Sequence, residues 1–232
     1  MAGTLIFGGT AEGRLAAEKE KDAVVCVATE YGASLLPAGT RCLVGRLEQS
    51  EMKTLMLEEQ PARVIDATHP YAVRATANIR ACCTELGIPY ERISRPSVSA
   101  SWSTLVRHAG TPEEAAWMLS ETGGNILLTT GSQTLDIFAS AVPVQRLWVR
   151  VLPTPAALDF CKRSGILPSH IIAMQGPFSP ELNEALYDQF DIQVMVTKDS
   201  GKAGGLEEKV LPALAREMDV IVIDRPEEET GS

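Results

Sequence analysis

One short segment near position 68 gathers side chains that could bind an anion or move a proton. It reads Asp-Ala-Thr-His-Pro-Tyr over residues 66–71. An imidazole such as that of His69 can bind a carboxylate or transfer a proton, and the phenol of Tyr71 can donate one. We therefore take His69 and Tyr71 as candidate catalytic residues. A purely structural histidine in a capped turn is the alternative that this segment leaves open.

A glycine-rich turn close to the start of the chain is the second candidate for chemistry. Residues 8–14 read Gly-Gly-Thr-Ala-Glu-Gly-Arg, after an apolar run over 4–7 and before a helical pattern that reaches about Lys21. A strand, glycine turn and helix form the layout of a phosphate-cradling loop. The spacing is neither G-x-G-x-x-G nor a Walker loop, so a turn needed only for chain reversal stays open.

Two further strand ends in the first half could contact the rest of a dinucleotide. A predicted strand over 23–29 ends at Thr29-Glu30, where a Rossmann domain reads the adenosine ribose. The carboxylate of Glu30 suits a 2′-hydroxyl and would repel a 2′-phosphate. Gly45 and Arg46 follow a third predicted strand over 41–44.

The second half of the chain carries polar, glycine-bearing turns over residues 129–132, 175–177 and 197–201. Each turn follows a predicted strand and precedes a helix, so all three should lie on the same rim of a sheet. A lysine at such a strand end, as at Lys198, suits a carboxylate or phosphate. For Lys202, a substrate contact and a solvated loop charge are equally open.

The elements that position these residues follow from apolar periodicity. Residues 63–66 predict a buried strand, and an alanine-rich pattern from 72 to about 86 predicts a helix. The first half gives a β-α-β-β-α-β-α-β series, and the second half gives about five strands, over 125–129, 146–152, 170–174, 193–196 and 220–223. The fold class is therefore α/β, with mostly parallel sheets. The serine-rich residues 94–104 are the best linker candidate.

Composition narrows the class of protein. The chain has 232 residues, 45% hydrophobic, and a formal net charge of -9, so we expect a sizeable core and no nucleic-acid surface. Five cysteines without a C-x-x-C pair indicate reduced core thiols in a cytoplasmic protein. We find no metal-ligand spacing and no apolar stretch of membrane-spanning length, and Gly8 and Gly9 interrupt the only run that could be a signal peptide.

Together these strings resemble the precorrin-6A reductases of corrin biosynthesis, in both the metal-free and the cobalt-containing routes. The resemblance rests on residues 8–14 and 66–72, and on 130–132, 175–179 and 197–201 with Gly205 and Glu208-Lys209. It covers nearly the whole chain, in the family's order. The string at 66–72, Asp-Ala-Thr-His-Pro-Tyr-Ala, is far more specific than a glycine turn.

The resemblance implies two Rossmann-like domains that lack the usual glycine fingerprint. Residues 1–95 would bind coenzyme, and residues 96–232 would bind much of the tetrapyrrole. The family can also exchange terminal strands, in which case residues 88–93 would pair in the second sheet and residues 220–223 (within a last strand near 219–225) in the first. Such enzymes reduce one double bond of the macrocycle with a nicotinamide cofactor, here NADPH, with NADH still possible.

The candidate site then divides into two groups. The expected coenzyme contacts are Gly8, Gly9, Thr10, Glu12, Gly13, Thr29, Gly45, Arg46 and Thr68. The expected contacts to the anionic tetrapyrrole are Arg14, His69, Arg74, Thr130, Ser132, Gln175, Lys198, Ser200 and Lys202. The proton donor is open between His69, Tyr71 and a water molecule. A transient contact with the next enzyme of the pathway is a further expectation.

Two other kinds of protein compete with this interpretation. One is a non-catalytic, two-domain binder of a small anion, and the other is a cofactor-free tetrapyrrole enzyme similar to uroporphyrinogen synthase. Neither needs a nicotinamide, whereas the glycine turn after the first strand favours a reductase.

Overall fold

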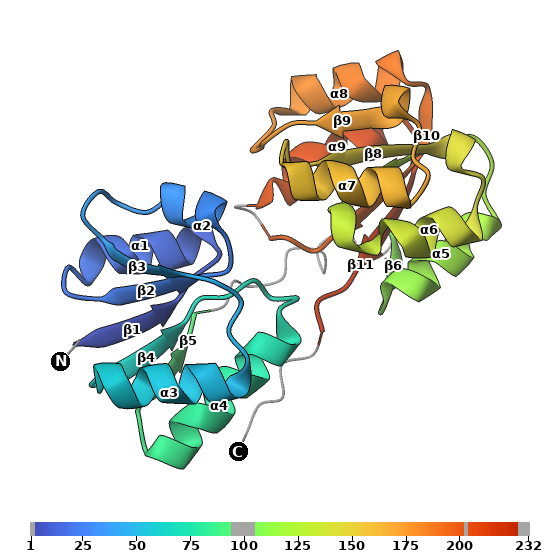
Figure 1. The fold of residues 1–232 in the computed structure, drawn as a ribbon. Helices are drawn as coiled ribbons and strands as arrows, with labels where there is room; N and C mark the ends of the chain where they lie inside the picture. Colours follow the sequence, from blue (N-terminus) through green and yellow to red (C-terminus); the bar gives the residue numbers. More distant parts are fainter. Residues whose placement is uncertain (1–2, 94–104, 202–203, 227–232) are drawn as a thin grey trace. The chain divides into compact units, whose positions relative to one another are not determined.

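The computed structural model describes residues 3–93, 105–201 and 204–226 and divides the chain into two compact units, Met1–Arg95 and Pro96–Ser232 (Figure 1). Each unit contains one parallel sheet covered by helices, so the predicted α/β class with two Rossmann-like units is confirmed. The predicted linker lies outside the described residues.

The first unit has a sheet in the order β3-β2-β1-β4-β5. Its strands are β1 (Thr4–Phe7), β2 (Val24–Val27), β3 (Arg41–Val44), β4 (Arg63–Asp66) and β5 (Tyr90–Arg92), and its helices are α1 (Ala11–Lys19), α2 (Glu30–Ser34), α3 (Gln49–Glu59) and α4 (Val73–Leu86). The chain runs outward from β1 to β3 and then returns to place β4 on the other side of β1. The strand order therefore reverses between β1 and β4, where α/β proteins bind ligands.

Both faces of this sheet are buried, which explains the continuous apolar runs of its central strands. On one face Leu5 and Val64 pack with Met56 of α3 and Ile79 of α4. On the other face Ile6, Val25 and Ile65 pack with Ala16 and Ala17 of α1. The small side chains of α1 bring that helix close to the sheet.

The second unit has a six-stranded sheet in the order β6-β11-β10-β7-β8-β9, with every neighbouring pair parallel. Its strands are β6 (Arg107–Ala109), β7 (Asn125–Leu128), β8 (Leu147–Val151), β9 (Ile171–Ala173), β10 (Ile192–Lys198) and β11 (Asp219–Ile223). Its α-helices are α5 (Pro112–Ser120), α6 (Leu135–Ala141), α7 (Pro155–Arg163), α8 (Pro180–Gln189) and α9 (Leu206–Ala215). Three of these helices begin with a proline after a Thr or Ser whose side chain accepts a backbone N–H, at Thr111, Thr154 and Ser179.

The expected exchange of terminal strands is wrong. Strand β5 pairs with β4 in the first sheet, and β11 lies between β10 and β6 in the second. Asp66 is paired in register with Arg92, and their side chains form an ion pair that holds β5 at the edge of its own sheet. The apolar sequence of β11 suits an interior position, because its residues 220–223 are all buried.

Among the α-helices and strands of the described residues, β6 and α2 were not predicted. Strand β6 contains an arginine and a histidine and lacks the apolar run that marks a buried strand, as befits an edge position. Helix α2 is a single short turn that no apolar period could reveal.

The five cysteines form no disulfide in the structure, and all except the half-buried Cys42 are buried, which confirms their prediction as mostly core residues. Burial raises the pKa of the Cys26 thiol to about 12, so this thiol is unreactive at neutral pH. In the described ranges no helix is both long and apolar enough to cross a bilayer. Those ranges also hold no group of three or more potential metal ligands.

Candidate active site

The glycine turn and the His69 segment lie against each other at the carboxyl ends of β1 and β4. The Thr10 hydroxyl donates to the carbonyl oxygen of Ala67 at 3.0 Å. A β-carbon at Gly13 would lie 3.3 Å from the β-carbon of Ala67, and one at Gly9 would lie 4.0 Å from the amide nitrogen of His69. The structure thus brings the glycine turn and the string at 66–72 together at the point where the strand order reverses.

The start of α1 has the features of a pyrophosphate cradle. Thr10 caps the helix by accepting a hydrogen bond from the Gly13 amide at 3.2 Å, and its carbonyl accepts from the Arg14 amide at 3.3 Å. Backbone N–H donors gathered at the start of a helix favour an anion. Gly9 has a φ of 151°, which other residues rarely adopt, and it leaves the approach clear of a side chain. A dinucleotide pyrophosphate fits the chemistry of these donors.

The turns after β2 and β3 leave the sheet side by side, because Val27 pairs in register with Val44. Thr29 caps α2 by accepting from the Gly32 amide at 3.0 Å, and the amide of Gly45 donates to the Val27 carbonyl at 2.9 Å. Glu30 and Arg46 are exposed on this edge of the sheet. Both remain candidates for the contact with the adenosine ribose.

A buried carboxylate at the end of β4 organises the His69 segment, and two of its partners, Tyr90 and Arg92, were not among the predicted site residues. Asp66 is fully buried. One of its oxygens accepts from the Thr68 hydroxyl at 2.7 Å and from Arg92 Nη1 at 2.8 Å, and the other accepts from the Tyr90 hydroxyl at 3.0 Å. Tyr90 and Arg92 alternate along β5, and that spacing was the only available signal. Since the Thr68 hydroxyl donates to Asp66, its first role is to hold this turn.

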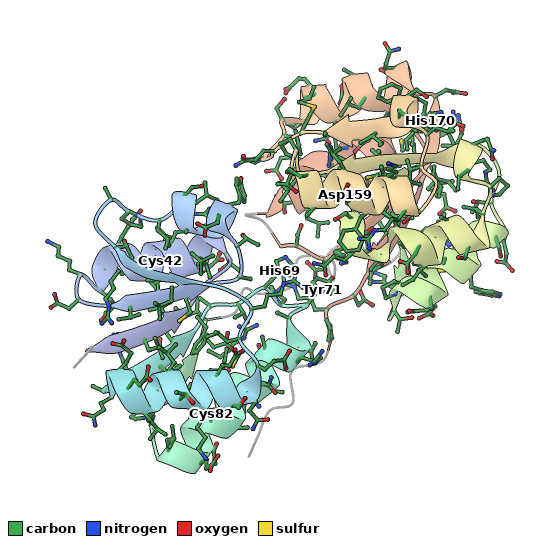
Figure 2. The ribbon with its side chains drawn as sticks, viewed as in Figure 1. Cys42, His69, Tyr71, Cys82, Asp159 and His170 are labelled. Carbon is green, nitrogen blue, oxygen red and sulfur yellow. The ribbon has the colours of Figure 1, made fainter. Side chains whose placement is uncertain are left out.

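His69 and Tyr71 lie together in the turn between β4 and α4, with ring centroids 5.5 Å apart (Figure 2). The Tyr71 amide donates to Nδ1 of His69 at 3.4 Å. A neutral imidazole that accepts at Nδ1 carries its proton on Nε2. The exposed His69 ring can therefore present an N–H donor, or in its charged form a cation, to an anionic ligand.

The other two histidines have structural surroundings. His170 stacks on Trp148 with ring centroids 4.0 Å apart. His108 Nδ1 lies 2.7 Å from a carboxylate oxygen of Asp224. Neither residue follows the carboxyl end of a strand, so neither enters the candidate site.

Three further predicted site residues of the first unit lie on helices α1 and α4. Arg14 and Glu12 are half-buried on α1. Arg74 pairs with Glu48 at 3.3 Å, and their side chains are 86% and 71% exposed. An ion pair so exposed contributes about 0–1 kcal/mol, so Arg74 can exchange Glu48 for a ligand carboxylate at little cost.

In the second unit the predicted residues occupy one rim, because they follow the carboxyl ends of β7, β9 and β10. Thr130 is buried and accepts from the Thr134 hydroxyl at 3.3 Å, whereas Ser132 starts a short 3₁₀ helix and Gln175 is exposed. Lys202 lies outside the described residues.

The turn after β10 is held by a buried ion pair. Asp199 is 1% exposed, and its Oδ1 lies 3.3 Å from Arg225 Nη2, while Arg225 Nε donates to the Asp199 carbonyl at 3.0 Å. Ser200 donates to the Gly204 carbonyl at 3.2 Å. Half-buried Lys198 sits beside this pair, and burial lowers the pKa of its ammonium group. The turn thus presents a desolvated lysine on a fixed backbone.

Comparisons with known proteins agree with this arrangement of motifs. The model of the family described as "Precorrin-6x reductase CbiJ/CobK" matches residues 4–232. A cobalt-precorrin-6A reductase of Priestia megaterium is 36% identical, over 98% of this chain and 92% of the relative. A precorrin-6A reductase of Mycobacterium tuberculosis is 31% identical, over 97% and 90%.

A solved structure, "CobK precorrin-6A reductase", superposes with a TM-score of 0.77 at 25% identity, over 98% of this chain and 89% of that one. These matches confirm the resemblance and favour it over the anion binder and the cofactor-free enzyme. The chain belongs to the precorrin-6x reductase family.

Proposed function

We propose that this chain reduces one double bond of precorrin-6A, or of its cobalt complex, with NADPH in cobalamin biosynthesis. The observation that carries the proposal is the contact between the glycine turn and the His69 segment at the switch point of the first sheet. The same contact puts an anion cradle beside a histidine and a tyrosine. The two relatives above carry the names of the two forms of this activity.

The first unit holds the coenzyme in this proposal. Gly8, Gly9 and the first turn of α1 bind the pyrophosphate, and the turns after β2 and β3 bind the adenosine ribose. When bound, the nicotinamide supplies the hydride. In this proposal Arg46 accompanies a 2′-phosphate, whereas the carboxylate of Glu30 opposes one. The two residues favour different coenzymes, so the preference for NADPH or NADH is decided by measurement.

The second unit holds much of the tetrapyrrole, whose carboxylates need cationic and hydroxyl contacts. Lys198, Ser200, Thr130, Ser132 and Gln175 supply them at one rim, with Lys202 as a further candidate. Arg14, Arg74 and His69 of the first unit supply the remaining contacts. The protein works in the cytoplasm and passes its product to the next enzyme of the pathway in a transient contact.

His69 binds or orients the substrate through its Nε2 atom, and a proton is delivered to the carbon beside the one that receives hydride. Tyr71 and His69 are the side chains that can supply this proton, directly or through a water molecule. The Asp66 network keeps the segment rigid while they do so.

An anaerobic assay tests the proposal. The purified chain is mixed with precorrin-6A and with cobalt-precorrin-6A, each with NADPH and with NADH, and oxidation of the coenzyme is followed together with the absorption of the macrocycle. We expect stoichiometric reduction of at least one macrocycle, with NADPH the better coenzyme. No turnover in any of the combinations would overturn the proposed function.

A further inference from the structure

Two cationic side chains of the second unit are buried almost completely at the rim that carries the predicted substrate contacts. Arg150, one residue before the end of β8, is 7% exposed, and Lys209, in the first turns of α9, is 6% exposed. Arginine and lysine are rarely buried to this degree unless they are paired with an acid. Neither residue was among the predicted site residues, although Lys209 belongs to one of the strings that carry the family resemblance.

The partners of these two side chains do not neutralise them. Arg150 Nη1 donates to the amide oxygen of Asn183 at 2.6 Å, and the guanidinium carbon lies 4.3 Å from the centre of the Phe178 ring. Lys209 Nζ has a long hydrogen bond of 3.5 Å to the Ser200 hydroxyl. Among the described residues neither side chain forms a salt bridge, so neither buried charge is paired directly with an acid.

The carboxylates nearest to Lys209 do not neutralise the two buried cations. Asp199 is already engaged by Arg225 and by the Gly201 amide. Glu208 interacts with Lys209 only over a longer range, and its Oε2 is buried without a hydrogen bond in the described structure. The cations Arg225, Arg150 and Lys209 thus outnumber the nearby carboxylates of Asp199 and Glu208. Burial and the neighbouring Arg150 lower the pKa of Lys209 to about 7.

The surrounding structure holds these two cations in place. Asn183, which orients Arg150, also donates to the carbonyls of Ser179 and Glu208 at 2.9 Å, so it ties the start of α8 to the start of α9. The Tyr187 hydroxyl donates to the Lys209 carbonyl at 2.8 Å. Such support is typical of a preorganised binding site. The two buried charges that it holds cost stability while no ligand is bound.

We propose that Arg150 and Lys209 together bind one carboxylate of the tetrapyrrole substrate. The inference rests on the proposed function, because a polycarboxylic macrocycle supplies the missing counter-charge. A carboxylate accepts up to four hydrogen bonds, and the guanidinium and ammonium groups offer donors that the protein leaves unused by any acid. The side chain of Ser200, one of the predicted contacts, already lies against Lys209 and links this pair to the rest of the rim.

Equilibrium binding of precorrin-6A and of its cobalt complex, without coenzyme, tests the pair. Arg150→Met and Lys209→Met should each raise Kd and KM roughly 10- to 100-fold, the usual effect of losing a desolvated charge-assisted contact, with a smaller change in kcat. The matched control is Arg163→Met, because Arg163 also stacks on a phenylalanine, with 4.4 Å to the ring centre of Phe160, but is exposed at the far end of α7. It should leave Kd unchanged.

A second measurement separates a ligand site from a structural role. Without ligand at pH 6, Lys209→Met should unfold at a higher temperature than the wild type, since it removes an uncompensated buried charge. A lower unfolding temperature, or Kd values within twofold of wild type for both variants, would overturn the inference. Wild-type protein that binds the macrocycle but never reduces it would overturn the proposed function alone, and protein that neither binds nor reduces it would overturn both.

Discussion

The backbone of Gly9 lies against the backbone of His69, so that a β-carbon at position 9 would stand 4.0 Å from the His69 amide nitrogen. The two residues are far apart in the sequence, and they meet because β1 and β4 pair in register, with Phe7 opposite Asp66. The backbone of Gly9, which carries no side chain, therefore lies beside the polar side chains of residues 66–71.

Substitution of Gly9 should weaken coenzyme binding. Gly9→Ala places a side chain on the approach to α1 and forces a φ of 151° on a residue that avoids it, at a cost of roughly 1–3 kcal/mol. We expect Kd for NADPH, measured by coenzyme fluorescence, to rise at least about tenfold.

Gly87→Ala is the matched control for this substitution. Gly87 also has a positive φ, of 66°, but it ends α4 and a β-carbon there would meet nothing within 4 Å. It should lower stability without changing coenzyme affinity. Equal losses of affinity in the two variants would show that the glycine turn has no special part in binding.

The ion pair between Arg92 and Asp66 should be essential for the stability of the first unit. Arg92→Met leaves a fully buried carboxylate with its tyrosine and threonine partners only, and removal of one member of a buried pair costs about 3–5 kcal/mol. Chemical denaturation should show this loss. Arg74→Met removes a pair of which both members are exposed and should cost at most about 1 kcal/mol. The interpretation is wrong if the two variants are equally stable.

Much of the architecture was predictable because parallel strands buried on both faces leave continuous apolar runs, and because Thr111, Thr154 and Ser179 mark helix starts by their own chemistry. These signals are local. The same reasoning missed β6, whose Arg107 and His108 are tolerated only because the strand lies at the edge of its sheet. The exchange of strands came from the resemblance and not from any local signal, and it was wrong.

The site was predictable only in part, because local sequence signals do not show which side chains meet in the folded sheet. The positions of the motifs at strand ends followed from the order of the elements. The partners of Asp66 did not, because Tyr90 and Arg92 come from a strand that adjoins β4 only in the folded sheet. The burial of Arg150 and Lys209 was not predictable either. Arg150 lies in an apolar strand and Lys209 in a helix, and charged residues in such elements are ordinarily solvated.

His69 should affect substrate binding more than Tyr71 does, and Tyr71 should affect the chemical step more. His69→Gln keeps a donor but loses the cation, so we expect KM for the macrocycle to rise about tenfold with a smaller change in kcat. If the Tyr71 hydroxyl donates the proton, Tyr71→Phe should lower kcat by about 10²- to 10⁴-fold. A Tyr71→Phe enzyme with wild-type kcat would assign the proton to His69 or to water, and His69→Gln with wild-type KM and kcat would remove His69 from the site.

The dependence of stability on pH should carry the signature of Lys209. The groups around its ammonium are Arg150 from β8, Asp199 after β10 and Glu208 on α9, while the Tyr187 hydroxyl bonds its carbonyl. The pKa of Lys209 is lowered to about 7 from its ordinary value of 10.5. Between these values the unfolded chain holds a proton that the folded chain has lost, so this residue makes stability rise with pH across that window.

Below pH 7 the folded protein contains the buried charge and carries its full destabilising effect. The stability advantage of Lys209→Met over wild type should therefore be largest at pH 6 and shrink steadily between pH 7 and pH 10. Comparing the two proteins at each pH cancels the titration of every other group that the substitution leaves alone. A difference that stays constant over this range, measured by thermal unfolding, would mean that Lys209 titrates at its ordinary pKa and that its charge is solvated in the folded protein.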